Sequence, residues 1–139
     1  MTLADHGAMV KLLAQTPGVT LREADSYGRT QAYLDRNPGL SFLARTEAGE
    51  VVGMVMCGHD GRRGYLQHLL VKPDYRGQGL AKALVQRCLD QLATLGIFKT
   101  HIFIRQENTT GEAFWQHLGW AERDDVKMYS FNRSSNPNI

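Results

Sequence analysis

The sequence has only two cysteines and four prolines among its 139 residues. Cys57 and Cys88 are far apart and each lies in an apolar pattern, which favours buried free thiols over a disulfide or a metal pair. No apolar run is long enough to span a bilayer, and the N-terminus lacks the basic region and apolar stretch of a signal peptide. We therefore expect a reduced, soluble, cytoplasmic protein.

The sequence also lacks a large excess of either charge. It has 16 Lys and Arg and 14 Asp and Glu, which gives a net charge of +2. This balance gives no support for nucleic acid binding, which relies on a basic surface. No His-x-x-x-His or carboxylate pairing indicates a metal site. The length and the 42% hydrophobic content suit one globular domain. We expect that domain over residues 1–131, followed by a disordered polar tail at 132–139.

The most informative stretch joins an apolar run, Tyr65–Val71, to a helical pattern that starts near Gly79. A strand, a glycine-rich corner and a helix start together make an anion site, because the first helical N–H groups have no intrahelical partner. Arg76 and Lys82 bring full positive charges to the same corner. The stretch therefore predicts a phosphate or pyrophosphate site. An ordinary strand-to-helix turn is the alternative, because the third glycine of a dinucleotide fingerprint and the Gly-Lys-Ser/Thr of an ATP loop are absent.

The remaining patterns predict an α/β fold with a mixed sheet flanked by about four helices. Helices are expected from Asp5 to before Pro17, over Ser26–Arg36, from Gly79 to about Leu95, and from Asn108 to Leu118. Strands are expected over residues 40–44, 51–57, 65–71, 97–104 and 127–131. The first three strands form an antiparallel meander. A helical crossover makes the strands at 65–71 and 97–104 parallel.

Two spaced motifs resemble those of the GNAT N-acetyltransferase superfamily. Arg76-x-x-Gly79-x-Ala81, preceded by Val-x-Pro-x-Tyr, is similar to the acetyl-CoA pyrophosphate motif. The segment from Asn108 to Trp120 resembles the superfamily pattern Asn-x-x-Ala-x-x-x-Tyr-x-x-x-Gly-Phe. The resemblance implies an enzyme that moves an acetyl group from acetyl-CoA to a primary amine of a small molecule or peptide by direct transfer. The resemblance implies that no metal is needed, and it is compatible with a homodimer. It gives no reason to expect nucleic acid or membrane partners.

The resemblance also implies which residues bind acetyl-CoA. The parallel strands would splay apart, and the pantetheine arm would pair with the backbone of Leu69, Leu70 and Val71. The pyrophosphate would be held by Arg76, Gly77, Gln78, Gly79, Leu80, Ala81 and Lys82. Asn108 and Trp115 would lie along the pantetheine. The loop that joins the first two helices, with Arg22, Glu23, Asp25 and Tyr27, would line the acceptor pocket.

The superfamily's usual catalytic residues are absent. Trp115 stands where many relatives have a tyrosine acid, and an indole N–H cannot usefully give up a proton. Phe103 and Gln67 stand where relatives have a glutamate base. Strand alternation puts Gln67 and His68 on opposite faces, so His68 packs under a helix if Gln67 faces the cleft. The candidates that remain are His68, Glu23 and Asp60 as base and Tyr129 as proton donor.

A missing base matters less for a weakly basic acceptor. At pH 7 an α-amine with a pKa of about 8 is neutral roughly one time in ten, whereas a lysine amine with a pKa of about 10.4 is neutral about once in 2,500 molecules. We therefore expect an α-amino or similarly weak base as acceptor. The alternative is a catalytically weak or inactive acyl-CoA-binding module.

The start of the chain also departs from the resemblance. GNAT chains usually open with a short strand, whereas only residues 1–4 precede the expected helix at Asp5. We expect this strand to be nearly absent or to lie upstream. The strand edge at residues 40–44 would then need another cover.

Overall fold

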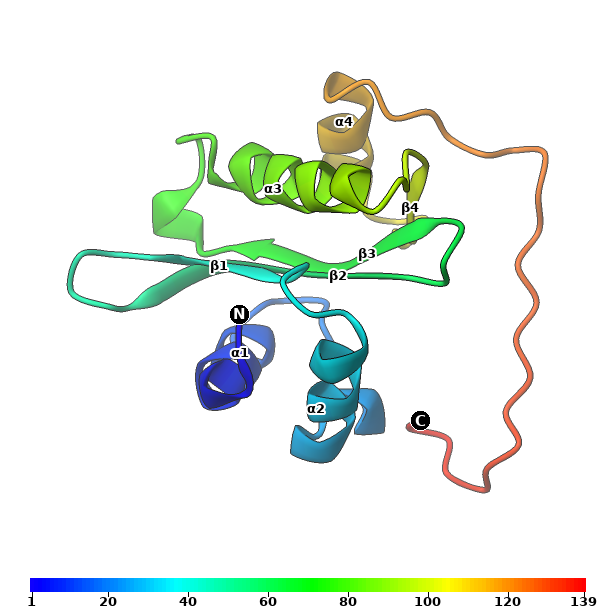
Figure 1. Cartoon of the computed structure of the whole chain (residues 1–139), viewed down its shortest axis with the longest axis horizontal. Helices are drawn as coiled ribbons and strands as arrows, with labels where there is room; N and C mark the ends of the chain where they lie inside the picture. Colours follow the sequence, from blue (N-terminus) through cyan, green and yellow to red (C-terminus); the bar gives the residue numbers. More distant parts are fainter. The chain divides into compact units, whose positions relative to one another are not determined.

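A four-stranded mixed sheet organises the fold in a computed structural model that describes all 139 residues (Figure 1). Its strands are β1 (Phe42–Arg45), β2 (Val51–His59), β3 (Gly64–Val71) and β4 (Thr100–Ile102), in that spatial order. The pairs β1–β2 and β2–β3 are antiparallel, and β3–β4 is parallel. The predicted mixed sheet is therefore confirmed. The chain forms two units, residues 1–102 and 103–139, and the sheet belongs to the first.

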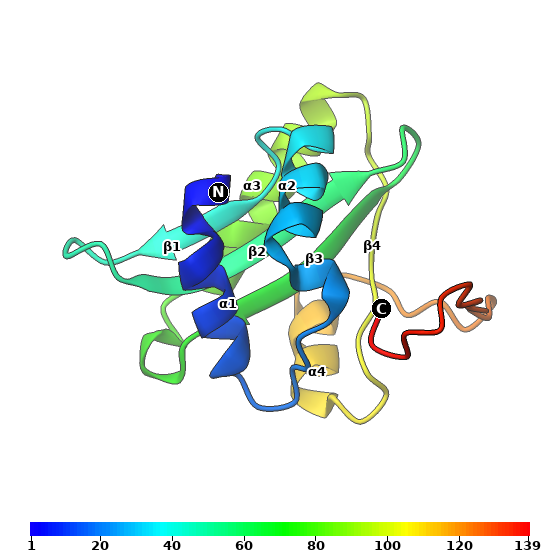
Figure 2. The same cartoon turned by 90° about the horizontal axis from the view of Figure 1, so that it is seen from below.

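Helices cover both faces of this sheet. Helices α1 (His6–Ala14) and α2 (Tyr27–Arg36) lie on one face, and α3 (Leu80–Thr94) lies on the other (Figures 1 and 2). Eight successive residues of β2, from Val51 to Gly58, are buried, as a central strand covered on both faces requires. The α3 side of the core is a helical stripe of Leu84, Val85, Cys88 and Leu92, and this stripe was visible in the sequence. None of the helices is long and apolar enough to cross a membrane.

The start of the chain forms a single 3-10 turn, Leu3–Asp5, in place of a strand. The α-amino group of Met1 donates to the carbonyl oxygen of Ser41 at 2.9 Å, and Asp5 pairs with Arg45 of β1. These contacts hold the turn beside the outer strand and so provide the cover that edge needs. Asp5 precedes α1 as predicted, but its carboxylate accepts the N–H of Thr2 (2.7 Å) and not a helical N–H.

The second unit contains one helix, α4 (Thr109–His117). The predicted strand at residues 127–131 is wrong, because every residue from 121 to 135 is exposed and none of them pairs with a strand. An alternating apolar pattern becomes a strand only where a neighbouring strand supplies the backbone hydrogen bonds. The predicted strand at 97–104 is likewise shortened to β4. The domain predicted over residues 1–131 would span the first unit and residues 103–131 of the second, and it stays a prediction together with the disordered tail.

The two cysteines are buried free thiols, as predicted. Cys57 lies on β2 and Cys88 on α3, and the thiol of Cys88 donates to the carbonyl oxygen of Leu40 at 3.3 Å. Its pKa is raised, first by a hydrogen bond with Cys57 and then by burial. The fold thus brings together two side chains that the sequence separates by 31 positions.

Candidate functional site

The predicted anion corner follows β3 directly. A 3-10 turn, Pro73–Tyr75, leads to Arg76, and α3 begins at Leu80. Gly77 and Gly79 both have left-handed backbones, with φ of 75° and 78°. A side chain is disfavoured at such angles, so glycine at these two positions lets the strand turn sharply into the helix.

The N-terminus of α3 offers unpaired N–H groups. Gly79 supplies no side-chain cap, and the first intrahelical bond runs from the N–H of Ala83 to the carbonyl of Gly79. The amides of the three residues before Ala83 therefore lack intrahelical partners. Five residues of this corner are exposed: Arg76, Gly77, Gln78, Gly79 and Lys82. Helical N–H groups without intrahelical partners, the helix dipole and the exposed residues Arg76 and Lys82 thus belong to one corner, whose binding of phosphate stays a prediction.

One edge of β3 is open beside this corner. Strand β4 pairs with β3 only from Gly64 to Leu66, whereas β3 continues to Val71. On the other side β2 still pairs with Leu70 and Val71, through Met54 and Gly53. The backbone of residues 67–71 therefore has no β4 neighbour, and an extended ligand can pair there as an added strand does.

A β-bulge interrupts this edge. Met54 pairs with Leu70 and Met56 with Gln67, so His68 and Leu69 together face the single residue between Met54 and Met56. His68 has a φ of 50°, and no other residue except glycines has a positive φ. A left-handed backbone costs a residue with a side chain about 1–2 kcal/mol. Strict strand alternation, used above to place Gln67 and His68 on opposite faces, fails at this point.

The bulge directs His68 toward the segment between α1 and α2. Its Nε2 lies 2.8 Å from Oδ1 of Asp25, which ends the 3-10 turn Glu23–Asp25. The other oxygen of Asp25 accepts the N–H of Arg22 at 2.8 Å, and its main-chain carbonyl lies 2.9 Å from Nε2 of His6. Asp25 is only 8% exposed. His68 therefore packs against this turn and not under a helix.

Sequence reasoning named Asp25 only as a loop residue. Its burial could not be foreseen, since an Asp in a polar loop is usually solvated. The spacing from Arg22 to Asp25 is that of a capping box, in which the acidic side chain accepts the N–H of the residue before the turn, and it is a local signal for one of its hydrogen bonds. The contact with His68 joins positions 43 residues apart and has no local signal.

The other candidate catalytic residues have different surroundings. Glu23 forms an ion pair with Arg29 at 3.7 Å. Asp60 accepts the N–H groups of Arg63 (2.7 Å) and Arg62 (2.8 Å), and these bonds lower its pKa and weaken it as a base. Tyr129 is 88% exposed and lies in the second unit, outside any strand, so its predicted place on a last strand is wrong.

Asn108 directly precedes α4 and Trp115 lies on it, both in the second unit. Asn108 caps the helix, accepting the N–H of Gly111 at 2.9 Å. A Cβ at position 111 would lie 2.5 Å from Nδ2 of Asn108, so an alanine there would require the Asn108 side chain to shift. Trp115 is 6% exposed, and its ring centroid lies 4.6 Å from that of Trp120.

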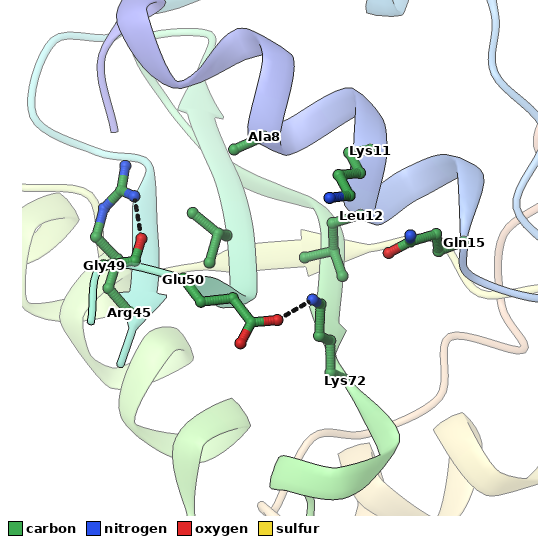
Figure 3. Close-up of a pocket in the computed structure, with 9 residues that line it drawn as sticks. Ala8, Lys11, Leu12, Gln15, Arg45, Gly49, Glu50 and Lys72 are labelled. Atoms are coloured by element: carbon green, nitrogen blue, oxygen red, sulfur yellow. Dashed lines mark hydrogen bonds and ion pairs between the residues drawn. The ribbon is translucent and has the colours of Figure 1, made fainter. Parts of the chain in front are cut away.

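A separate pocket of about 240 Å³ lies between α1, the β1–β2 hairpin and the end of β3 (Figure 3). Two of its cationic side chains are already paired, Lys72 with Glu50 at 2.5 Å and Arg45 with the carbonyl of Gly49 at 3.0 Å. None of the predicted site residues lines it. This pocket is therefore distinct from the glycine corner.

A family model described as the acetyltransferase (GNAT) family matches residues 8–120. The chain belongs to this family. An acetyltransferase of Sodalis glossinidius is 40% identical over 95 residues, which make up 68% of this chain and 66% of that relative. The match thus spans slightly less than two thirds of the relative's length.

Solved GNAT structures share the fold. Aminoglycoside N-acetyltransferase AAC(6')-Iy, in complex with the bisubstrate analogue CoA-S-monomethyl-acetylneamine, superposes with a TM-score of 0.73 at 22% identity over 95% of each chain. A ribosomal-protein-alanine N-acetyltransferase from Brucella melitensis biovar Abortus superposes with a TM-score of 0.72 at 24% identity, over 95% of this chain and 94% of the other. The predicted GNAT fold is confirmed by these structures. The predicted enzyme class, an acyltransferase, is confirmed by membership of the acetyltransferase family.

Proposed function

We propose that this protein transfers an acetyl group from acetyl-CoA to a primary amine of a small molecule or peptide. The observation that carries the proposal is the uncapped N-terminus of α3, which follows two left-handed glycines at the end of an open strand edge. This arrangement suits a ligand that carries a pyrophosphate and an extended amide-containing arm, as CoA does. The complex of a GNAT neighbour with a CoA-containing bisubstrate analogue supports the same ligand.

In this proposal the corner from Arg76 to Lys82 binds the pyrophosphate through its amides and two side-chain charges. The pantetheine arm pairs with the backbone of Leu69 to Val71, which has no β4 neighbour, and this brings the thioester toward the bulge at His68. Asn108 and Trp115 are assigned to the pantetheine only by the family resemblance. No metal ligand set is required.

The reaction is a direct transfer. The lone pair of a neutral acceptor amine attacks the thioester carbonyl carbon, the new C–N bond forms, and the C–S bond breaks to release the CoA thiolate. The amine must lose a proton before attack and a second one after it, and the thiolate takes up one proton. General base catalysis of such a step is worth typically about 10²–10⁴-fold.

We propose that the acceptor is an amine of low basicity, such as an α-amine. The support is the absence of the family's glutamate bases, since Gln67 and Phe103 stand in their places. The named neighbours act on quite different amines, an aminoglycoside and a ribosomal protein. A cytoplasmic setting is part of the proposal and is supported by the two free thiols. A homodimer stays a prediction.

The test is release of free CoA thiol from acetyl-CoA with a panel of amino acids, polyamines, aminoglycosides and short peptides. Arg76→Glu is the test variant, and Arg87→Glu, an exposed charge reversal further along α3, is the matched control. The proposal is supported if thiol release depends on one acceptor. That release should be lost in Arg76→Glu and retained in Arg87→Glu. Tight CoA binding without turnover on any acceptor favours the alternative, an acyl-CoA-binding module.

A further inference from the structure

We infer that Asp25 is the positioning residue that makes His68 the general base of the transfer. The inference rests on the proposed function and adds two roles to it. The contact between Oδ1 of Asp25 and Nε2 of His68, at 2.8 Å, carries it.

The hydrogen bonds at Asp25 fix the tautomer of His68. A carboxylate only accepts hydrogen bonds, and Oδ2 already accepts the N–H of Arg22 at 2.8 Å. Nε2 of His68 must therefore carry the hydrogen that points at Oδ1, and in the neutral ring this leaves Nδ1 as an acceptor. No protein group bonds to Nδ1, and the His68 side chain is 25% exposed. The ring thus presents a proton-accepting nitrogen while its other end is held.

His68 lies where the two substrates of the proposed reaction meet. Its side chain contacts the 3-10 turn at Glu23–Asp25, between α1 and α2, which is the segment proposed to line the acceptor pocket. Its backbone immediately precedes the open edge at Leu69–Val71, which is proposed to hold the pantetheine arm. A residue forced into a left-handed backbone at that junction is a sign of function more than of packing, because a glycine would adopt it freely.

The proton transfers balance. The acceptor ammonium gives one proton to Nδ1 of His68, whose imidazolium is stabilised by Asp25 through Nε2. The neutral amine then forms the C–N bond as the C–S bond breaks. The attacking nitrogen loses its second proton, the CoA thiolate takes up one proton, and His68 returns its own to solvent.

The surroundings of His68 contain few other titratable groups. Asp25 is its only hydrogen-bonded partner, and His6 of α1 reaches the carbonyl of Asp25 at 2.9 Å without touching the ring of His68. On β2 the bulge faces apolar residues from Met54 to Met56. The remaining candidate bases are engaged elsewhere, Glu23 with Arg29 and Asp60 with the turn amides of residues 62 and 63.

Asp25→Asn tests the tautomer directly. The asparagine amide is the same size but donates to Nε2, which moves the ring hydrogen to Nδ1 and removes the acceptor nitrogen. We expect kcat to fall about 100-fold or more with the panel's active acceptor, while the KM for acetyl-CoA stays within about threefold. Nitrogen-15 NMR of the free protein should show the hydrogen on Nε2 of His68 in the parent and on Nδ1 in the variant. Asp35→Asn, an exposed carboxamide change on α2, is the control and should change neither.

His68→Gln provides a second route that leaves Asp25 and its turn in place. With an α-amine acceptor of pKa about 8 the neutral amine fraction rises roughly tenfold between pH 7 and pH 9, so solvent replaces the base and the deficit of the variant should shrink by up to about tenfold. A deficit that is constant across this range shows a structural role and overturns the inference, as does an Asp25→Asn enzyme with kcat within about threefold of the parent. A parent protein with no turnover on any acceptor refutes the proposed function itself. CoA affinity, measured by calorimetry, verifies that each variant is folded.

Discussion

Arg76 donates a hydrogen bond from Nε to the carbonyl oxygen of Val71 at 3.0 Å. The bond ties the cation of the glycine corner to the last residue of β3. It leaves the two terminal nitrogens of the guanidinium to face the surface, where they can bind a phosphate with two parallel N–H groups. The strand end and the proposed phosphate site are thus held in one geometry by a single side chain.

Arg76→Lys should therefore weaken CoA binding although it keeps the charge. A lysine ammonium cannot bond Val71 and present a two-pronged donor at the same time. We expect the Kd for CoA, measured by calorimetry, to rise about 3- to 10-fold, and to rise further in Arg76→Glu. Arg87→Lys on α3 is the control. Equal affinities for Arg76→Lys and the parent would mean that only the charge of Arg76 matters.

The backbone of Gly79 gives a second prediction. Gly79 and Gly96 flank the two ends of α3 with nearly equal φ of 78° and 74°, and a Cβ would touch nothing within 4 Å at either position. Alanine at either one should lower the free energy of unfolding by a similar amount, about 1–2 kcal/mol. Only Gly79→Ala should also raise the Kd for CoA, by roughly tenfold, because it tilts the amides of the proposed anion site.

The two glycine variants can also contradict the proposed anion site. If Gly79→Ala and Gly96→Ala both leave CoA affinity unchanged, the N-terminus of α3 does not bind the pyrophosphate. If both variants weaken CoA binding equally, the loss of affinity comes from the lower stability of the whole protein.

Much of this corner could be predicted because its signals are local. The apolar run of β3, the glycines at 77 and 79 and the 3.6-residue stripe of α3 all lie within about 30 residues of one another. The fold of the first unit followed from such patterns, with helix ends correct to within one or two residues.

The parts that the sequence did not predict depend on contacts between distant segments. The bulge at His68 depends on the register of β3 with β2, and the contact between His68 and Asp25 joins that bulge to a turn 43 residues earlier. The prediction of a strand at 127–131 was wrong because a partner was missing. Apolar and polar residues do alternate there, but no neighbouring strand pairs with the segment. Alternation of apolar and polar residues predicts which residues share a face of a strand. It does not predict whether a partner strand is present.

Gly64 is required by close packing between β3, β4 and α3. A Cβ at this position would lie 2.5 Å from Cδ1 of Leu92 and 2.8 Å from Oγ1 of Thr100. Gly64→Ala should therefore lower the free energy of unfolding by about 1–3 kcal/mol in urea denaturation. Gly7→Ala on α1 is the matched control, because its Cβ would touch nothing within 4 Å and helix propensity favours it by up to about 1 kcal/mol.

Leu92→Val tests whether the clash is the cause. The shorter side chain gives room to the new methyl group, so the two substitutions should be less destabilising together than the sum of their separate effects. Additive effects would assign the loss to the strand backbone at Gly64.

Tyr33 connects the buried thiols to alkaline stability. Its hydroxyl group is buried without a hydrogen-bond partner, and burial together with the nearby thiols of Cys57 and Cys88 raises its pKa. The folded protein keeps this proton at a pH where the unfolded chain loses it, so the free energy of unfolding falls as pH rises above about 10, by roughly 1.4 kcal/mol per pH unit.

Tyr33→Phe should remove both effects. We expect the free energy of unfolding at neutral pH to stay constant or rise by about 1 kcal/mol, because an unsatisfied buried hydroxyl is lost. Above pH 10 the variant should lose stability less steeply than the parent in pH-dependent denaturation. Tyr129→Phe, which removes a hydroxyl from a side chain that is 88% exposed, is the control and should follow the parent curve. If Tyr33→Phe destabilises the protein at neutral pH, the hydroxyl has a bonding partner in solution and its burial does not drive the alkaline loss.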